Sequence, residues 1–392
     1  MPPHIRRKIF TGLTAVAVFL FAAGLLLDGR GTSRAAVEGL RLCGQVLIPS
    51  LFPFFVVSQF CVRSGLAGIV GHAFRRPMAW LFGLPGACAP AFVLGIIGGY
   101  PVGAHTAISL YQQRLCTKAE AERLLAFCNN SGPAFILGAV GAMAFGTTGA
   151  GVLLYGAHVT ASVGVGLLLR RGRTHAPQRP DEPLRAEAMP LSRALTSAVS
   201  ESAAGIVNIC AFVIFFAVII RLLLISGALP AAARALAVPL SPLGLSAEML
   251  ERLLSGLIEI TSGVYGLTAI AAGTGFKLTA AAFMLGWAGL SVHCQVLAFI
   301  GQSGLRTGPY IVGKLLHGGI SSVIVWTITR LLPFDAQVGK TLSGQVTALG
   351  RFSPSAAFSL ALIAVMAVWG ISLALGAAFR RKRPCKVRGK SL

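Results

Sequence analysis

Charge is scarce in this sequence. Only 12% of its 392 residues are charged and only 12 are acidic, whereas soluble domains carry roughly 25% charged residues. The hydrophobic share is 55%, and several apolar runs reach or approach the roughly 20 residues with which a helix crosses a bilayer. The composition excludes a soluble globular protein and predicts an all-α polytopic membrane protein.

Motifs for covalent chemistry are also lacking. The chain contains no GxSxG elbow, no HExxH motif, no phosphate loop and no acidic pair at metal-ligand spacing. Its eight cysteines form no CxxC pair, so neither a zinc site nor a disulfide framework is predicted. We therefore expect that the protein is not an enzyme, holds no metal or cofactor, and does not drive transport with a nucleotide site of its own.

Basic residues outnumber acidic ones by 34 to 12, which gives a net charge of +22. The bases lie mainly in short segments beside apolar runs, at residues 6–8, 170–193 and 380–390. This pattern follows the positive-inside rule and suits contact with anionic lipid headgroups. We therefore expect membrane lipids rather than nucleic acid as partners, with both the N- and the C-terminus in the cytoplasm.

The apolar runs differ in whether polar or helix-breaking residues interrupt them. Uninterrupted runs lie at residues 9–27, 149–169, 204–225, 310–332 and 355–379. Interrupted runs lie at residues 40–62, with Pro49 and Pro53, and at 87–111 and 278–300. Two further segments, 118–146 and 247–272, begin amphipathically and break near the middle, so we interpret them as re-entrant helical hairpins. The prediction is about eight transmembrane helices plus two such hairpins.

The Pro-rich hydrophilic segment 170–193 divides the chain into a membrane half at 1–169 and another at 194–379, followed by a basic tail at 380–392. The sequence AFVLGIIGG at 91–99 resembles AFMLGWAGL at 282–290, and ERLL recurs at 122 and 251. We expect pseudo-symmetric halves, although the two echoes occur in opposite order. Four crossings per half would leave Arg114, Lys118 and Arg123 on the outer side, against the positive-inside rule.

Two breaks in the first half are candidates for a binding site. Irregular backbone at membrane depth is tolerated only inside protein or beside a water-filled cavity, and broken helices in secondary transporters meet at the substrate site. In CNNSGP, at 128–133, Pro133 suits the first position of a second half-helix, and Ser131 or Gly132 could cap it. Thr117 and Glu120 predict a capping box for the first half-helix.

Structural alternatives exist for both breaks. The Asn and Ser side chains of CNNSGP could satisfy backbone groups freed by a simple proline kink. In GGYPVG, at 98–103, Pro101 could open a half-helix after Gly99 and Tyr100, but glycines at this density also suit close helix packing.

In the second half the break is LIEITSG, at 257–263. Among the acidic residues, Glu259 alone has apolar neighbours over a turn on both sides, and an ionisable residue in such a run predicts a functional site. It could carry a proton or bind a cation with Thr261 and Ser262; the alternative is a carboxyl group that only holds the hairpin tip. His293 and His105 follow other breaks and could relay protons or serve in packing.

These motifs resemble a known family. LIPSLFPFFVVSQF, LGIIGGYPVGAHTA, CNNSGPAFILGAVG, EITSG and GLSVHCQV, in this order over about residues 40–330, resemble the sporulation integral membrane protein YlbJ family, which carries the nucleoside recognition or Gate domain. The resemblance implies an architecture related to concentrative nucleoside transporters, in an endospore-forming bacterium, and a role in moving dipicolinate. It also implies the mother-cell or outer forespore membrane as the location, and a homo-oligomer or sporulation membrane proteins as partners.

We therefore predict a secondary transporter or facilitator for a small anionic substrate. A nucleoside transporter and a non-transporting scaffold for spore assembly are the alternatives. The predicted substrate-binding residues are Asn129, Asn130, Ser131, Gly132, Gly99, Tyr100, Thr261, Ser262, Ser291 and His293. Glu259 and His105 are predicted to handle the coupling ion, H⁺ or Na⁺; because a dianion repels an ionised carboxylate, Glu259 should be protonated or cation-paired when substrate binds.

Overall fold

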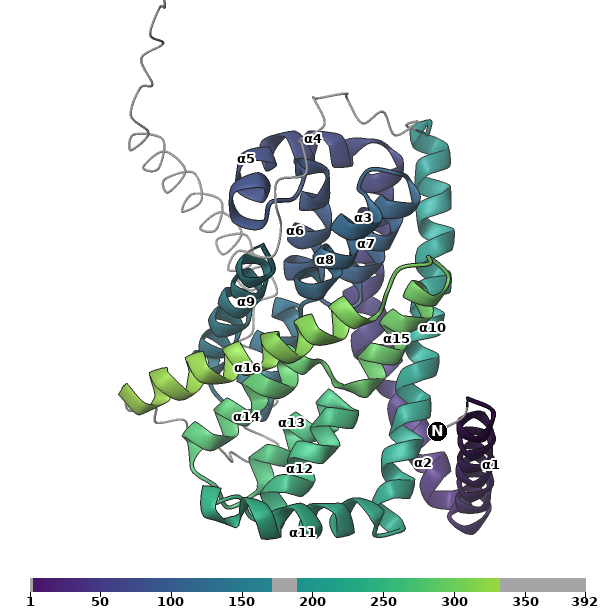
Figure 1. The fold of residues 1–392 in the computed structure, drawn as a ribbon, viewed down its shortest axis with the longest axis vertical. Coiled ribbons are helices and arrows are strands. Elements are labelled where there is room, and N and C mark those ends of the chain that lie inside the picture. Colours follow the sequence, from purple (N-terminus) through teal and green to yellow (C-terminus); the bar gives the residue numbers. More distant parts are fainter. Residues whose placement is uncertain (1–2, 171–188, 332–392) are drawn as a thin grey trace, which may run out of the picture.

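The computed structural model describes residues 3–170 and 189–331, and every regular element in these ranges is helical (Figure 1). The predicted all-α class is confirmed. The predicted run at 355–379, the tail at 380–392 and most of the linker at 170–193 lie outside the described residues.

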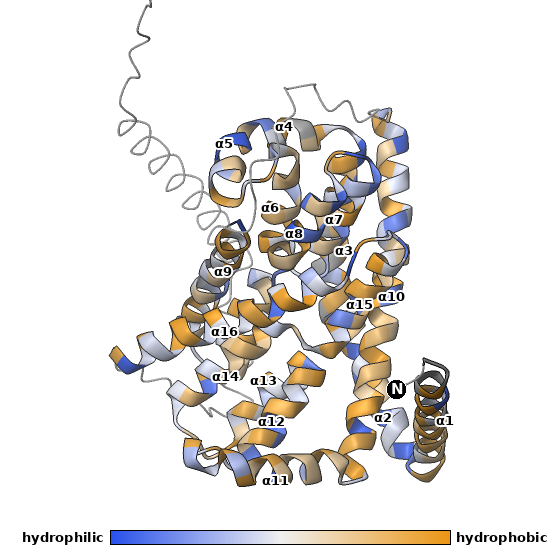
Figure 2. Ribbon diagram, viewed as in Figure 1, coloured by the Kyte–Doolittle hydropathy of each residue, from blue (hydrophilic) through white to orange (hydrophobic). Residues whose placement is uncertain are grey.

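Within residues 3–170 and 189–331, five helical segments are long and apolar enough to cross a membrane, or up to seven if each of two bent helix pairs counts as one span. Four uninterrupted runs are confirmed in α1 (Pro3–Leu27), α9 (Thr148–Arg170), α10 (Leu191–Ile225) and α16 (Gly308–Leu331). Apolar residues dominate these helices, and hydrophilic residues gather mainly at their ends and in the connections (Figure 2). The fold is therefore that of a polytopic helical membrane protein.

The predicted interruption of residues 40–62 is wrong. The chain stays helical through α2 (Gly29–Leu42), the π-helical segment η1 (Cys43–Leu47) and α3 (Ile48–Arg63). Pro49 directly follows the π-helical segment η1 at the start of α3, and it lacks the N–H that would continue the ladder of helical hydrogen bonds. Pro53 lies inside α3, and neither proline ends the helix.

Segment 87–111 is a helical hairpin rather than an interrupted span. Its arms, α6 (Ala89–Gly98) and α7 (Val102–Gln112), fold back on each other: a Cβ built on Gly103 would lie 2.9 Å from the Cα of Gly95. The thiol of Cys88, at the start of the segment, and that of Cys116, just beyond its end, lie within hydrogen-bonding range of each other. The chain therefore returns to the level at which it started.

Segment 118–146 is a broken helix, and the prediction that it forms a hairpin is wrong. Its two parts, α8 (Lys118–Cys128) and the π-helical η4 (Ala134–Ala144), pack on different partners. The α8 backbone lies against α16, where a Cβ on Gly313 would meet the Ala126 oxygen at 2.2 Å. By contrast η4 lies along α9, where a Cβ on Gly141 would be 2.4 Å from the Gly151 Cα.

The second half repeats the order of hairpin and then broken helix. In segment 247–272, α12 (Ala247–Ile258) and α13 (Ile260–Ala269) fold back on each other as a helical hairpin, and a Cβ on Gly263 would lie 2.1 Å from the Gly256 Cα; that the hairpin is re-entrant stays a prediction. The predicted break in 278–300 lies between α14 (Thr274–Trp287) and α15 (Gly289–Gly301), at two residues with φ of +79° and +78°. The two AF-x-LG echoes thus fall on a hairpin arm, α6, and on a broken helix, α14, and do not mark equivalent elements.

Short helices connect these parts at opposite ends of the molecule (Figure 1). α4 (Leu66–Ala73), α5 (Arg75–Pro77), η2 (Met78–Phe82) and η3 (Gly86–Cys88) lead into the first hairpin. α11 (Ala228–Leu240) and η5 (Ser241–Leu243) lead into the second, with a bend of 115° before α12.

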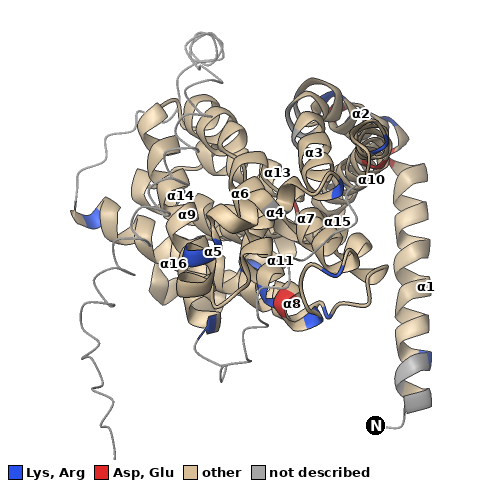
Figure 3. Cartoon of the chain, turned by 90° about the horizontal axis from the view of Figure 1, so that it is seen from above, with Lys and Arg blue, Asp and Glu red and all other residues tan. Residues whose placement is uncertain are grey.

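The first hairpin also changes the predicted location of basic residues. The Arg123 guanidinium donates to the Gly83 oxygen at 2.9 Å, and a Cβ on Gly83 would lie 3.7 Å from the Arg170 side chain. Arg123 therefore lies at the same end of the molecule as Arg170, and the prediction that put it on the opposite side is wrong. Few charged residues lie among the packed helices (Figure 3).

Candidate functional site

The two breaks of the first half face each other. A Cβ on Gly99 would lie 2.7 Å from the Gly132 nitrogen, and one on Gly132 would lie 3.3 Å from Gly98. Gly99 also has a φ of +84°, which side chains disfavour. The tip of the α6–α7 hairpin therefore packs on the CNNSGP break backbone to backbone. Glycine is required at Gly99, and a side chain at Gly132 would force its neighbour to shift by a few tenths of an ångström.

The capping pattern predicted around CNNSGP is partly confirmed. Thr117 and Glu120 form the capping box of α8, and Pro133 is the first helical residue of the second part. The Ser131 hydroxyl does not cap η4, because no side-chain capping bond forms there. Its backbone N–H instead donates to His158 Nε2 at 2.9 Å.

Asn129 connects the break to the second half of the chain. Its Nδ2 donates to the Tyr310 hydroxyl at 3.3 Å, and the Tyr310 oxygen lies 2.9 Å from His293 Nδ1. The Tyr310 hydroxyl can donate to Nδ1 or accept from it, and the tautomer of His293 decides which. The Asn129 backbone oxygen accepts a 2.8 Å bond from Lys314 Nζ.

A pair of histidines supports the other side of the break. The His158 and His317 rings lie 4.2 Å apart, and His317 Nε2 bonds the His158 backbone oxygen at 2.9 Å. Both side chains are fully buried. Since His158 Nε2 accepts the Ser131 N–H, the proton of the neutral ring lies on Nδ1.

Several polar atoms around the break are buried and lack a hydrogen-bond partner. They are Asn129 Oδ1, Asn130 Oδ1, His158 Nδ1, His293 Nε2 and His317 Nδ1, together with Tyr100 Oη and Ser131 Oγ, which lie close enough to each other to interact. Leaving such an atom unpaired costs about 1–3 kcal/mol, so a concentration of them suits a polar ligand that completes the bonds. This group of atoms is the candidate functional site.

The second-half break lies beside the hairpin tip of α12–α13. A Cβ on Gly289 would lie 3.2 Å from the Ile260 nitrogen. Glu259 is the N-cap of α13, and its two oxygens accept the N–H groups of Thr261 at 2.9 Å and Ser262 at 2.8 Å. The carboxyl group therefore holds the hairpin tip, which is the structural alternative given above.

The structure brings together most of the predicted substrate-binding residues but not all of them. Those at the candidate site are Gly99, Tyr100, Asn129, Asn130, Ser131, Gly132 and His293. Tyr100 also lies within electrostatic range of Glu259, and Ser291 is buried on α15 beside this region. Thr261 and Ser262 contribute backbone N–H groups to the hairpin tip, and the Ser262 residue is exposed.

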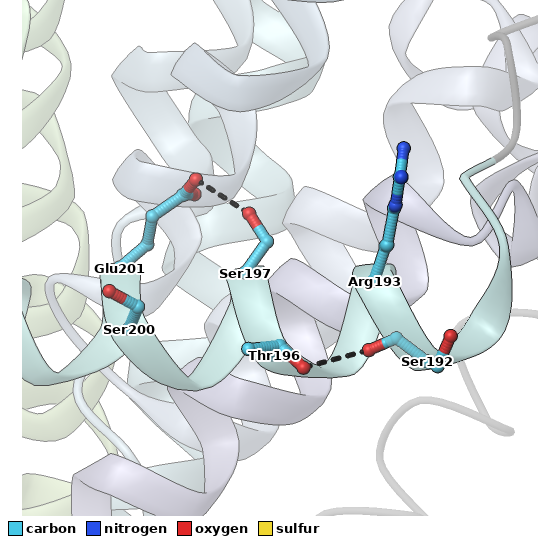
Figure 4. A pocket seen from close by; sticks show the side chains of 6 residues that line it. All are labelled: Ser192, Arg193, Thr196, Ser197, Ser200 and Glu201. Atoms are coloured by element: carbon cyan, nitrogen blue, oxygen red, sulfur yellow. Dashed lines mark hydrogen bonds between the residues drawn. The ribbon is translucent and has the colours of Figure 1, made fainter.

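His105 lies elsewhere. Its Nδ1 is hydrogen-bonded to Gln59 on α3, and its ring packs against Phe55 and Phe299 at centroid distances of 5.4 and 4.8 Å. A shallow surface pocket at the start of α10, lined by six residues from Ser192 to Glu201, also lies apart from the break (Figure 4).

Sequence reasoning missed Lys314, His317, His158 and Tyr310. The signal was present, because Lys314 and His317 lie within the apolar run 310–332 and His158 lies within 149–169. An ionisable residue in a membrane run is a functional candidate wherever it lies, but the prediction considered only Glu259 and the histidines beside the breaks.

The described residues form a bundle of apolar helices, with two broken helices and a buried polar site. These features define a polytopic helical membrane protein whose irregular backbone lies inside the protein. Residues 45–157, from the middle of η1 into the first half of α9, match the family model described as "Gate: Nucleoside recognition". The chain is 29% identical over 343 residues to the sporulation integral membrane protein YlbJ of Bacillus subtilis (strain 168), covering 83% of this chain and 84% of that protein. The resemblance to the YlbJ family predicted from the motifs is confirmed. No solved structure matches the chain.

Proposed function

We propose that this protein is a secondary transporter or facilitator for a small aromatic carboxylate, with dipicolinate as the first candidate, in a sporulation membrane. The observation that carries the proposal is the group of buried, unpartnered polar atoms where a hairpin tip meets a broken helix. Secondary transporters bind substrate at such junctions. The name of the similar B. subtilis protein supports the sporulation context.

The chemistry of the site favours an anion with ring and carboxylate groups. The hydroxyls of Tyr100 and Ser131, and His293 Nε2 in the tautomer that carries its proton there, are donors to a carboxylate. Lys314 adds a buried positive charge at the same break. The amide oxygens of Asn129 and Asn130 can accept bonds from a protonated ring nitrogen or from water.

Transport requires this site to open. Asn129, Asn130 and Ser131 are at most 1% exposed, and we propose that this burial under the hairpin, α9 and α16 is the closed conformation of a transport cycle. We propose that opening separates hairpin-bearing elements from the remaining helices. We propose that the protein lies in the mother-cell or outer forespore membrane, with both termini in the cytoplasm.

Reconstitution tests the proposal. Full-length protein in vesicles should take up labelled dipicolinate with saturation, and Ser131→Ala should weaken its affinity about fivefold, the equivalent of about 1 kcal/mol for one lost hydrogen bond. Thr160→Ala, an exposed hydroxyl of α9 that bonds only its own helix, is the matched control and should behave like the wild type.

The Gate match gives a nucleoside as the second candidate cargo. Competition decides between them. If nucleosides displace labelled dipicolinate at a lower concentration than unlabelled dipicolinate does, the cargo is a nucleoside. Vesicles that show no flux of either compound would favour the scaffold, and turnover of a compound without its flux would favour an enzyme.

A further inference from the structure

The carboxyl end of α8 stops inside the protein, so its last carbonyl groups need partners. The Phe127 oxygen accepts from the Ser162 hydroxyl at 2.7 Å and from Asn130 Nδ2 at 3.1 Å. The next oxygen, of Cys128, lies against the glycines of the first hairpin. The Asn129 oxygen accepts from Lys314 Nζ at 2.8 Å.

Lys314 therefore brings its ammonium group to the negative end of a half-helix. Secondary transporters use such carboxyl ends, with their free carbonyls and helix dipole, to coordinate the coupling cation. Lys314 is fully buried, and its aliphatic stem carries the charge from α16 across to α8. The position that suits a metal cation in a transporter is filled here by a side chain of the protein.

The groups that face Lys314 do not include a carboxylate among the described residues. Those with an electrostatic interaction with it are Cys128 of α8, His158 of α9, His293 of α15 and His317 of α16. On the neighbouring helices, the Glu122 carboxylate of α8 is held by Arg306 at 2.7 Å. Lys277 of α14 donates to the Thr268 oxygen at 3.1 Å.

A buried ammonium with carbonyl partners and neutral imidazoles, and without a counter-ion, is only marginally favoured over the neutral amine. Its charge can therefore change within a transport cycle. A sodium ion and a protonated lysine could not both occupy this end of α8, because like charges at contact distance in a buried site repel strongly.

We propose that Lys314 takes the place of the coupling cation at the carboxyl end of α8, so that the cation step of this transporter is protonation of Nζ and not binding of Na⁺. The proton is taken up from water when the site opens to one side and released to water when it opens to the other. The protonated form ties α16 to α8 and supplies the positive charge for a carboxylate substrate. This inference rests on the proposed function for its coupling role.

The position of the cation can be tested without transport. Purified full-length protein in lipid nanodiscs is unfolded thermally at constant ionic strength, in sodium chloride and in choline chloride. The wild type should show no sodium-specific shift of the melting temperature. Lys314→Ala should be less stable in choline and should regain stability with sodium, because sodium can then reach the vacated carbonyl groups.

Lys277→Ala is the matched control. This lysine is also largely buried and also bonds a carbonyl near a helix end, but Thr268 lies close to the exposed residue 271 at the base of the hairpin, where water can replace it. The variant should show no sodium-specific recovery. If Lys314→Ala does not yield folded protein, Lys314→Gln, which keeps a donor without the charge, takes the same measurement.

A sodium-specific stabilisation of the wild type overturns the proposal, and so does the absence of any sodium response in both Lys314 variants. In vesicles, an imposed proton gradient should accelerate wild-type dipicolinate uptake and should have no effect on Lys314→Gln; a retained response overturns the coupling role. Absence of flux in every variant refutes the proposed function instead, and the sodium measurement still decides what occupies the end of α8.

Discussion

Replacing Gly103 with alanine puts a methyl group where the structure has a backbone carbonyl. The added Cβ would lie 2.0 Å from the Cys128 oxygen, and ordinary contact begins at 3.4 Å, so hairpin and broken helix must separate by about 1.4 Å. The obstacle is backbone on α8 and cannot rotate away. Forcing extra volume into a packed interior typically costs about 1–3 kcal/mol, and occasionally more.

The assay is thermal unfolding of purified Gly103→Ala, together with the dipicolinate affinity of the folded fraction. Gly156→Ala on α9 is the control, because nothing lies within 4 Å of its added Cβ, and a helix interior gains up to about 1 kcal/mol from this change. We expect Gly103→Ala to melt well below wild type and Gly156→Ala at or above it. Equal melting temperatures for the two variants would refute the hairpin contact.

Three further changes test other contacts. Glu259→Gln removes one acceptor from the second hairpin tip, so we expect a loss of about 0.5–2 kcal/mol in unfolding free energy and, if Glu259 takes part in coupling, an altered pH profile of flux. Tyr310→Phe leaves the neighbours of its hydroxyl unpaired, at about 1–3 kcal/mol, and adding His293→Phe should cost less than the sum of the single changes. Asp28→Asn should destabilise the protein at neutral pH. The hydrogen bond from Arg221 lowers the pKa of the Asp28 carboxyl below 3.8, and this effect exceeds the rise caused by burial. The stability contributed by the ionised carboxylate is present above pH 3.8 and is lost as the pH falls through the lowered pKa.

Each of these expectations has an outcome that contradicts it. An unchanged melting temperature of Glu259→Gln would remove its capping role, and an unchanged pH profile of flux would remove its coupling role. Additive costs at Tyr310 and His293 would mean that the two side chains do not interact. For Asp28→Asn, a stability difference from wild type that persists unchanged below pH 3.8 would contradict the ionic tie, and Arg221→Gln is its matched control.

Local sequence patterns were sufficient for the helices and their caps. The long apolar runs of α1, α9, α10 and α16, the capping box at Thr117 and the helical start at Pro133 all depend on residues within a few positions of each other. Such features are set by helix periodicity and by backbone groups that must find partners nearby. Pro49 misled the prediction because the helix runs on through it, directly after a π-helical segment.

Which segment folds back could not be read from the sequence. Segments 87–111 and 118–146 have similar lengths, apolar content and central breaks. The difference arises from packing between distant parts: Gly95 and Gly103 close on each other around an α8 carbonyl, while Gly141 closes on α9. A glycine in the sequence does not indicate which backbone will approach it.

The candidate site was half visible in the sequence. Asn129 and Ser131 stood out because polar residues in an apolar run need a reason, and the structure places them at the centre of the site. Their partners His158 and Lys314 are 27 and 185 positions away from the atoms that they bond. Only the fold brings these side chains together, and a wider use of the rule on ionisable residues would have named them without showing what they contact.

The contact around the Cys128 oxygen limits how this protein can move. Side chains can change rotamer and let two helices slide, but here main chain touches main chain through Gly95 and Gly103, and no flexible layer lies between. The first hairpin and α8 must therefore travel as one rigid body or part completely. Any route for a solute has to run along the outer border of that body where α9 meets it through side chains such as His158 and Ser162, because α16 also touches the α8 backbone directly at Gly313.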